Sequence, residues 1–434
     1  MTNARTRQMA LTLFMLPFGY QTGVWRHPDS RPEEVGQLTL VREMAQAAER
    51  AKLHAAFFAD SLDVSALRLG GNRASGRYEP IVTMAALIGS TERLGLIGTA
   101  STTFSHPYNV ARQFAELDIL SEGRAGWNIV TSVAGQENFG MTLPDPQARY
   151  DRATEFVDVV RKLWSSWAPD AIVVDRERAM WADSDRIHDI EHVGRHFEVR
   201  GALTLPRPPQ GHPVLVQAGQ SEAGVRLGSA VADLIYTAQP DRDRSIEFYA
   251  DLKARVCAAG RDPERVRVMP GLMAIVGETQ AEAEEISADY GSWIDPVTGR
   301  AQVEAALELD TSDLELDDLL PLERIPDPER ATTPWQRTMA RYAPGRTLRE
   351  VMVTLSRSGG HQWIVGTPSS IADVMIDWFE SRACDGFNLN PPQVPVGMQR
   401  IFDLLVPELQ ERGYFQHDYR GDTLRERMGL EVVE

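Results

Sequence analysis

Short apolar runs alternate with amphipathic segments along most of the chain. Eight runs read as strands, each followed by a segment with helical periodicity; they lie at 9–15, 55–60, 94–103, 125–131, 213–217, 233–238, 266–276 and 385–390. Strands that alternate with helices at this spacing indicate a parallel sheet. Eight such units in 434 residues, with a helix after the last, favour a closed (β/α)8 TIM barrel of the α/β class over an open doubly wound sheet.

Two segments interrupt the repeat. The segment at about 172–207 is strand-like, and the segment at about 277–360 is long and acidic near Asp310 to Asp318. Long insertions on a barrel usually lie over its catalytic mouth or at a subunit contact. We therefore expect one barrel domain over residues 1–434, with both insertions over the C-terminal mouth.

Composition excludes several classes of partner. The net charge of −17 argues against nucleic acid, because an acidic surface gains nothing from counterion release. No apolar run approaches the length of a membrane span, and the polar start Met1 to Arg7 is not a secretory signal, so we expect a cytoplasmic protein without membrane contact. Cys257 and Cys384 stand far apart, so neither a disulfide framework nor a thiolate metal site is indicated.

One strand-to-helix junction has the features of an anion site. The apolar run that starts at Pro213 ends at Gly219, Ser221 takes the N-cap position, and Gly224 lies early in the helix that follows. Free backbone N–H groups and the positive end of the helix dipole suit a phosphate at such a position. On this stretch alone, an ordinary turn capped by Ser221 is the more common explanation, because many α/β connections have this pattern.

The predicted strand ends carry polar but mostly neutral side chains. In a barrel the chemistry lies at the C-terminal ends of the strands; these positions are Asp60, Thr103, Asn128, Thr131, Ser132, Gly219, Ser221, Asn388 and Asn390. Such a set makes no nucleophilic triad, no carboxylate pair and no metal cage, so a bound cofactor must carry the reaction. A barrel for sugar phosphates would need an acid/base pair that Asp60 alone does not supply. The glycine fingerprint of a dinucleotide fold is also missing.

A set of motifs resembles a known enzyme family. They are Trp25-Arg-His-Pro-Asp, Phe58-Ala-Asp-Ser, Leu120-Ser-Glu-Gly-Arg-Ala-Gly-Trp-Asn-Ile-Val-Thr-Ser, Arg149-Tyr150, Pro208-Pro-Gln-Gly-His-Pro-Val-Leu-Val-Gln-Ala-Gly-Gln-Ser and Asp385-Gly-Phe-Asn. This combination is similar to the nitrilotriacetate and dibenzothiophene-sulfone monooxygenases, which belong to the bacterial-luciferase-like flavin enzymes. The likeness runs from about Met9 to Leu430. It implies a (β/α)8 barrel that uses reduced FMN and O2, with the reduced FMN supplied by a separate NAD(P)H:flavin reductase.

The resemblance also implies which residues bind the cofactor. Asp60 matches a position beside the flavin ring, Thr103 one at the end of the third strand, and Tyr150 and Ser221 positions near the flavin phosphate and ribityl chain. The backbone of Gly219 and Gln220 lies beside them. Asn128 is added to this set because it lies at a strand end, although it could instead support the adjacent loop. Asp60 could likewise only cap the turn that follows it.

One residue departs from the family pattern. Many members carry a histidine four residues before the tyrosine, whereas this chain has Pro146 there, followed by Gln147. One contact beside the flavin is then lost or is supplied differently, with Gln147 as a candidate.

The histidines leave two interpretations open. His27 and His106 are candidate proton donors or acceptors near the substrate, or else loop histidines with structural partners. His188, His192 and His196 have the spacing of metal ligands on a helix, but glycine at 194 interrupts any helix there, and we expect no metal site.

The sequence therefore predicts a two-component FMNH2-dependent monooxygenase. It would oxygenate a small organic substrate or cleave its C–N or C–S bond by oxidation. The alternatives are a deazaflavin-dependent oxidoreductase of the same superfamily and a non-catalytic FMN-binding protein. Exposed helix faces on a barrel of this size make a homodimer or homotetramer the expected assembly.

Overall fold

Eight parallel strands close into a barrel in the computed structural model, which describes residues 7–63, 78–239, 241–331, 334–358 and 360–433. Around the barrel they are β1 (Ala10–Phe14), β2 (Ala55–Phe58), β3 (Gly95–Ser101), β4 (Ala125–Val130), β9 (Val214–Gln217), β10 (Leu234–Thr237), β11 (Arg267–Val276) and β13 (Gly386–Leu389). The pairing of β10 with β11, and of β13 with both β11 and β1, closes the ring. The predicted barrel is confirmed, and each of the eight predicted runs contains one of these strands.

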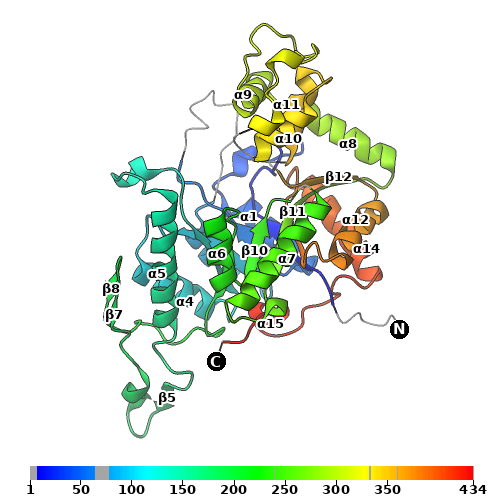
Figure 1. The fold of residues 1–434 in the computed structure, drawn as a ribbon. Coiled ribbons are helices and arrows are strands. Elements are labelled where there is room, and N and C mark those ends of the chain that lie inside the picture. Colours follow the sequence, from blue (N-terminus) through cyan, green and yellow to red (C-terminus); the bar gives the residue numbers. More distant parts are fainter. Residues whose placement is uncertain (1–6, 64–77, 240, 332–333, 359, 434) are drawn as a thin grey trace.

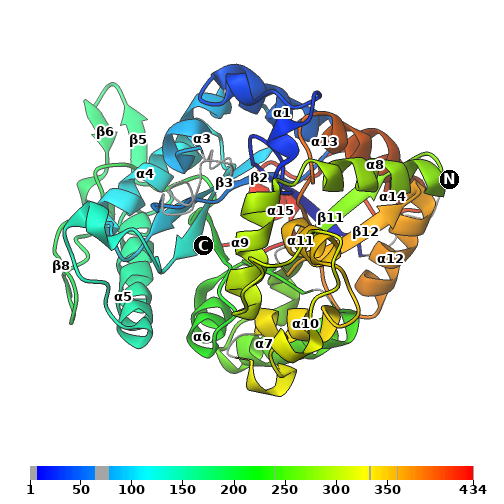
Figure 2. The ribbon, with the colours of Figure 1, turned by 90° about the horizontal axis from the view of Figure 1, so that it is seen from above.

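Helices surround the strands (Figure 2). They are α1 (Leu38–Arg50), α3 (Pro80–Ile88), α4 (Pro107–Leu120), α5 (Pro146–Trp164), α6 (Glu222–Val231), α7 (Arg242–Ala258), α12 (Pro368–Glu380), α13 (Val396–Arg400) and α14 (Val406–Glu411). Several begin at a side-chain cap, for example Asp145 before α5 and Ser221 before α6. Among the described helices, none combines the length and the apolar character that a bilayer crossing requires.

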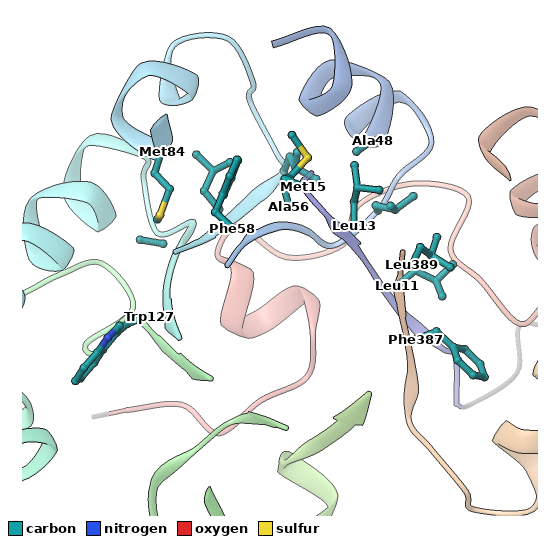
Figure 3. Close-up of a cluster of buried hydrophobic side chains, with 14 of the residues drawn as sticks. Leu11, Leu13, Met15, Ala48, Ala56, Phe58, Met84, Trp127, Phe387 and Leu389 are labelled. Atoms are coloured by element: carbon teal, nitrogen blue, oxygen red, sulfur yellow. The ribbon is translucent and has the colours of Figure 1, made fainter. Parts of the chain in front are cut away.

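Alternate residues of each strand face the helices or the barrel interior. Leu11, Leu13 and Phe58 point outward and pack towards α1 and α3 in Figure 3. Their neighbours Ala10 and Phe57 belong to the interior cluster. The short helix α15 (Leu424–Arg427) adds Leu424 and Met428 to that interior cluster and so closes the N-terminal end of the barrel.

A ninth strand, β12 (Gln362–Gly366), extends one part of the barrel wall. It pairs in parallel with the C-terminal half of β11, from Leu272 onwards. Leu272 also pairs with β13, so β12 lies on the opposite side of β11, where the pairing with β10 has ended at Pro270. The wall therefore rises beyond the end of β10. The sequence analysis did not predict this strand.

The two insertions emerge at opposite ends of the barrel (Figure 1). Two hairpins form the first: β5 (Ile172–Asp175) with β6 (Met180–Ala182), and β7 (His192–Val193) with β8 (Glu198–Val199). The second contains α8 (Gln280–Ser292), α9 (Pro296–Leu307), α10 (Pro334–Tyr342) and α11 (Leu348–Ser358). Helices α9 to α11 stand above the C-terminal strand ends, and β5 lies far from them.

The expected position over the mouth is therefore wrong for the first insertion. It follows α5, and a barrel helix runs back towards the N-terminal ends of the strands. A segment inserted after such a helix emerges at that end. The second insertion follows strand β11, which delivers it to the C-terminal end.

Candidate active site

A cavity of about 300 Å³ opens at the C-terminal ends of the barrel strands. Its volume is near the lower end of the range of roughly 300–1,000 Å³ that is typical of small-molecule sites. Side chains and backbone from β1, β2, β3, β4, β10, β11 and β13 line it, together with the turn after β9. The cavity thus lies where the barrel fold places catalytic sites.

Aromatic rings form one part of the lining. The rings of Phe57 and Tyr236 have centroids 4.6 Å apart, and Phe14 lies 5.2 Å from Phe57. Burial raises the pKa of Tyr236, so its phenol stays protonated. The hydroxyl donates to Thr12 Oγ1 at 3.1 Å. This part of the site is an apolar wall of mutually inclined aromatic rings, and a buried hydrogen bond fixes the Tyr236 ring.

A chain of hydrogen bonds continues from Thr12 to the end of β13. Thr12 Oγ1 donates to Asn388 Oδ1 at 2.8 Å, and Asn388 Nδ2 donates to Asn390 Oδ1 at 3.3 Å. These bonds fix which way both amides face. Asn390 Nδ2 is then left buried, with no hydrogen-bond partner among the described residues.

The opposite wall, on β3 and β4, holds a second oriented amide. Asn128 Nδ2 donates to Thr99 Oγ1 at 2.9 Å, and Thr99 Oγ1 donates to Phe58 O at 2.9 Å. Asn128 Oδ1 is buried without a partner in the described part of the chain. Since an unpaired buried acceptor is costly, a donor on a bound molecule is expected opposite it.

Asp60 and Thr103 occupy different positions relative to the cavity. Asp60 lines it, and also lines an adjoining cavity of about 120 Å³ beside Ser101 and Ser132. One Asp60 oxygen accepts from the backbone N–H of Ser61 at 2.8 Å. Thr103 is buried at the end of β3, its Oγ1 has no partner among the described residues, and it lines neither cavity.

The turn between β9 and α6 meets a tyrosine from α5. Ser221 Oγ accepts from Gly224 N at 3.2 Å and lies 3.4 Å from Tyr150 Oη. A Cβ on Gly219 would collide with Gln217 Nε2 and come within 2.8 Å of Tyr150 Oη. Only glycine leaves this space open. The structure thus brings Tyr150, Gly219 and Ser221 together, and places Gln220 in the cavity lining beside them.

Gln147 is not free to replace the family histidine beside the flavin, because both polar atoms of its side chain already have partners. Its Oε1 accepts from Arg226 at 3.3 Å, and its Nε2 donates to Asp151 at 2.6 Å. The side chain is exposed and links α5 to α6. Pro146 is the first residue of α5, where its missing N–H costs nothing.

The two predicted catalytic histidines lie outside the cavity lining. The His27 ring is held by Asp289 Oδ2, 2.8 Å from Nε2, and by the edges of Tyr290 and Trp293. His106 is exposed, and its Nδ1 accepts from Tyr108 N at 3.2 Å to cap α4. Their sequence position near strand ends does not place either residue in the lining of this cavity.

His361 is the histidine that the structure brings to the cavity. It directly precedes β12, and its ring lies edge-on to Tyr20 with centroids 5.3 Å apart. The sequence analysis missed it. The only available signal was the short apolar run Trp363-Ile-Val that follows it.

The histidines of the first insertion form no metal cage. His192 Nε2 lies 3.2 Å from Glu155 Oε1, and His196 N donates to the same carboxylate. In the part of the chain that the structure describes, no group of three or more His, Cys, Asp or Glu side chains could hold a metal ion.

Comparisons with known proteins identify the relatives of this chain. The model of the luciferase-like monooxygenase family matches residues 17–385. N-acetyl-S-(2-succino)cysteine monooxygenase of Bacillus subtilis is 39% identical over 99% of this chain and 98% of its own length. Component A of nitrilotriacetate monooxygenase of Aminobacter aminovorans is 38% identical over 98% and 97%. A riboflavin lyase, solved with modified FMN and riboflavin, is 31% identical with a TM-score of 0.83, over 98% and 97%.

A parallel (β/α)8 barrel with a cavity of about 300 Å³ at its C-terminal strand ends thus defines the class of protein. Within that class, the chain belongs to the luciferase-like monooxygenase family. The predicted family and enzyme class are confirmed. The same comparisons support reduced FMN and O2 as the reagents and a small organic molecule as the substrate.

Proposed function

We propose that this chain is the oxygenase component of a two-component monooxygenase. It binds reduced FMN in the cavity and uses O2 to oxygenate a small organic molecule or to cleave its C–N or C–S bond. One observation carries the proposal: the cavity combines an aromatic surface with oriented neutral amides, next to a turn that suits a phosphate.

The residues present fit a flavin. A flavin ring is flat and carries donors and acceptors along one edge, which matches an aromatic surface facing the unpartnered atoms Asn128 Oδ1 and Asn390 Nδ2. We propose that Asp60, Thr103 and Asn128 hold the ring side of the cofactor. Because Thr103 lines neither cavity, its proposed role is to support the side chains that do line them.

The phosphate end fits the turn after β9. Gly219, Gln220 and Ser221 present backbone N–H groups at the start of α6, where the helix dipole favours an anion. The Tyr150 hydroxyl lies within reach of the same place, 3.4 Å from Ser221 Oγ. We propose these four residues as the phosphate and ribityl contacts.

The bound flavin supplies the reduction of O2 and the transfer of one oxygen atom. The chain must orient the substrate and keep water away, because unproductive reaction with O2 otherwise yields hydrogen peroxide. Helices α9 to α11 stand above the strand ends and form their own apolar core, which includes Val303, Leu307 and Val351. We propose that this insertion covers the mouth and restricts access to it.

The first test is binding and oxygen uptake by the purified protein. We expect saturable anaerobic binding of reduced FMN. With NADH and an unrelated flavin reductase, we expect O2 consumption that rises with the right carboxylate, sulfone or thioether and yields less than one peroxide per O2. A deazaflavin oxidoreductase would turn over without O2, and a storage protein would hold oxidised FMN tightly without turnover. No binding of reduced FMN would refute the proposal.

A separate NAD(P)H:flavin reductase is the proposed partner, as the two-component family implies. Exchange of reduced FMN by diffusion needs no stable complex. Since NAD(P)H and a reducing environment are available in the cytoplasm, we propose a cytoplasmic location.

We also propose a homodimer or homotetramer. Hairpin β5–β6 projects from the body of the protein and exposes apolar side chains, with Trp181 59% and Val174 54% exposed (Figure 1). Such a surface is typical of a subunit contact. Light scattering coupled to size exclusion should give a mass of two or four chains, and the double substitution Val174→Ser with Trp181→Ser should lower it. A monomer in the unaltered protein would contradict the proposal.

A further inference from the structure

His361 lies at a seam in the barrel wall. Strand β10 ends at Thr237, and β12 begins beyond it on the same side of β11. The residue before β12 therefore sits at the rim. His361, Thr237 and Ala238 all line the cavity there.

The ring presents an unsatisfied atom at this seam. His361 Nδ1 is buried and has no hydrogen-bond partner among the described residues. A Cβ on Gly271 would collide with that nitrogen and lie 2.8 Å from Asn390 Nδ2. The two unpartnered nitrogens thus flank the same notch, which glycine at 271 keeps open.

The imidazole is neutral at physiological pH. Burial lowers the pKa of His361 to about 4, because the charged form would lose its hydration. A neutral ring has one donor and one acceptor nitrogen, so Nδ1 can pair with either kind of group without placing a charge beside a flavin. Asp60 and Tyr236 are the other titratable side chains of the cavity lining.

We propose that His361 is a catalytic residue of this site, which forms a hydrogen bond from Nδ1 to the polar edge of the bound flavin ring, next to Asn390. This inference rests on the proposed function, since it assumes that the cavity holds reduced FMN. Unlike His27 and His106, His361 lines the cavity. The residue holds the ring in place across from Asn128.

The test compares two substitutions that differ at the Nδ1 position. The Asn side chain places a polar atom near the position of Nδ1, whereas Phe keeps the ring shape and removes the polar atom. We expect His361→Phe to weaken anaerobic binding of reduced FMN by about tenfold to a hundredfold, since an unpaired buried group loses about that much. His361→Asn should stay within about threefold of the unaltered protein. His417→Phe, at an exposed position, is the matched control.

A second readout is the NMR spectrum of the unaltered protein, and the His361→Asn variant serves only to assign the resonance. In protein labelled with ¹⁵N-histidine, the Nδ1 resonance that His361→Asn removes should shift when reduced FMN is added. An unshifted resonance, with binding demonstrated, would refute the flavin contact. Equal affinities of His361→Phe and the unaltered protein would also refute it, even if peroxide release rose. Failure of the unaltered protein to bind reduced FMN would instead refute the proposed function.

Discussion

Arg425→Met is expected to lower the free energy of unfolding by about 3–5 kcal/mol, the usual loss when one partner of a buried ion pair is removed. Arg425 Nη2 lies 2.8 Å from Asp233 Oδ2, and Nη1 donates to Asp233 Oδ1 at 3.1 Å. The side chains are only 5% and 6% exposed. The substitution would leave the buried Asp233 carboxylate with one remaining cation, Arg261, whose Nη2 lies 3.6 Å from Oδ1.

The pair also connects distant parts of the chain. Arg425 belongs to α15, which closes the N-terminal end of the barrel, and Asp233 directly precedes β10. The same guanidinium donates to the carbonyl oxygens of His212 and Glu431, at 3.1 and 2.8 Å. Asp233 Oδ2 in turn accepts from Leu215 N at 2.9 Å. Loss of Arg425 therefore loosens α15 and the starts of β9 and β10 together.

Urea and thermal unfolding followed by tryptophan fluorescence measure this effect. The matched control is Arg349→Met, which breaks an exposed pair with Asp317 at 2.7 Å. Exposed pairs contribute about 0–1 kcal/mol, so its midpoint should hardly move. If the two substitutions shift the midpoint equally, the Arg425–Asp233 pair does not hold this end of the barrel.

The barrel strands were predictable because each carries a local signal. Runs such as Leu11-Thr-Leu and Val214-Leu-Val are short and mostly apolar, and each precedes a segment with helical periodicity. Strand β12 carries the same kind of local signal, Trp363-Ile-Val before a helix, but eight strands already close a barrel and leave no position for a ninth. Its pairing with the free edge of β11 is a tertiary contact that the local pattern does not show.

The same difference decides which site residues could be found. Asp60, Asn128 and Asn390 come at or near the ends of barrel strands, so the rule for barrel sites located them. His361 precedes its strand and still reaches the rim, because β12 begins where β10 ends. The rule for barrel sites considers the C-terminal ends of strands, whereas His361 lies at the N-terminal end of β12. His27 follows β1, but its ring pairs with Asp289 of α8, and the residue does not line the cavity.

Gly219→Ala is expected to weaken binding of reduced FMN by about a hundredfold or more. The new Cβ would collide with Gln217 Nε2 and lie 2.8 Å from Tyr150 Oη and 3.2 Å from Gly224 Cα. Either the tyrosine or the turn must move. Hydrogen bonds to a charged group contribute about 1.5–3 kcal/mol each, so losing two of them accounts for this factor.

The comparison of FMN with riboflavin isolates the phosphate. Reduced riboflavin has the same ring and ribityl chain, so Gly219→Ala should change its affinity much less than that of reduced FMN. Anaerobic titrations followed by fluorescence give both constants. Gly89→Ala is the matched control, because a Cβ at Gly89 would meet nothing within 4 Å and the backbone φ there is −80°.

Two outcomes would count against the phosphate role of the turn. If Gly219→Ala weakens both flavins equally, the turn shapes the ring pocket and does not bind the phosphate. If it weakens neither, the space between Gly219 and Tyr150 is not used by the cofactor at all. A selective loss for FMN would instead establish that the N-terminus of α6 holds the phosphate, and would fix the direction in which the ring extends towards Asn128 and His361.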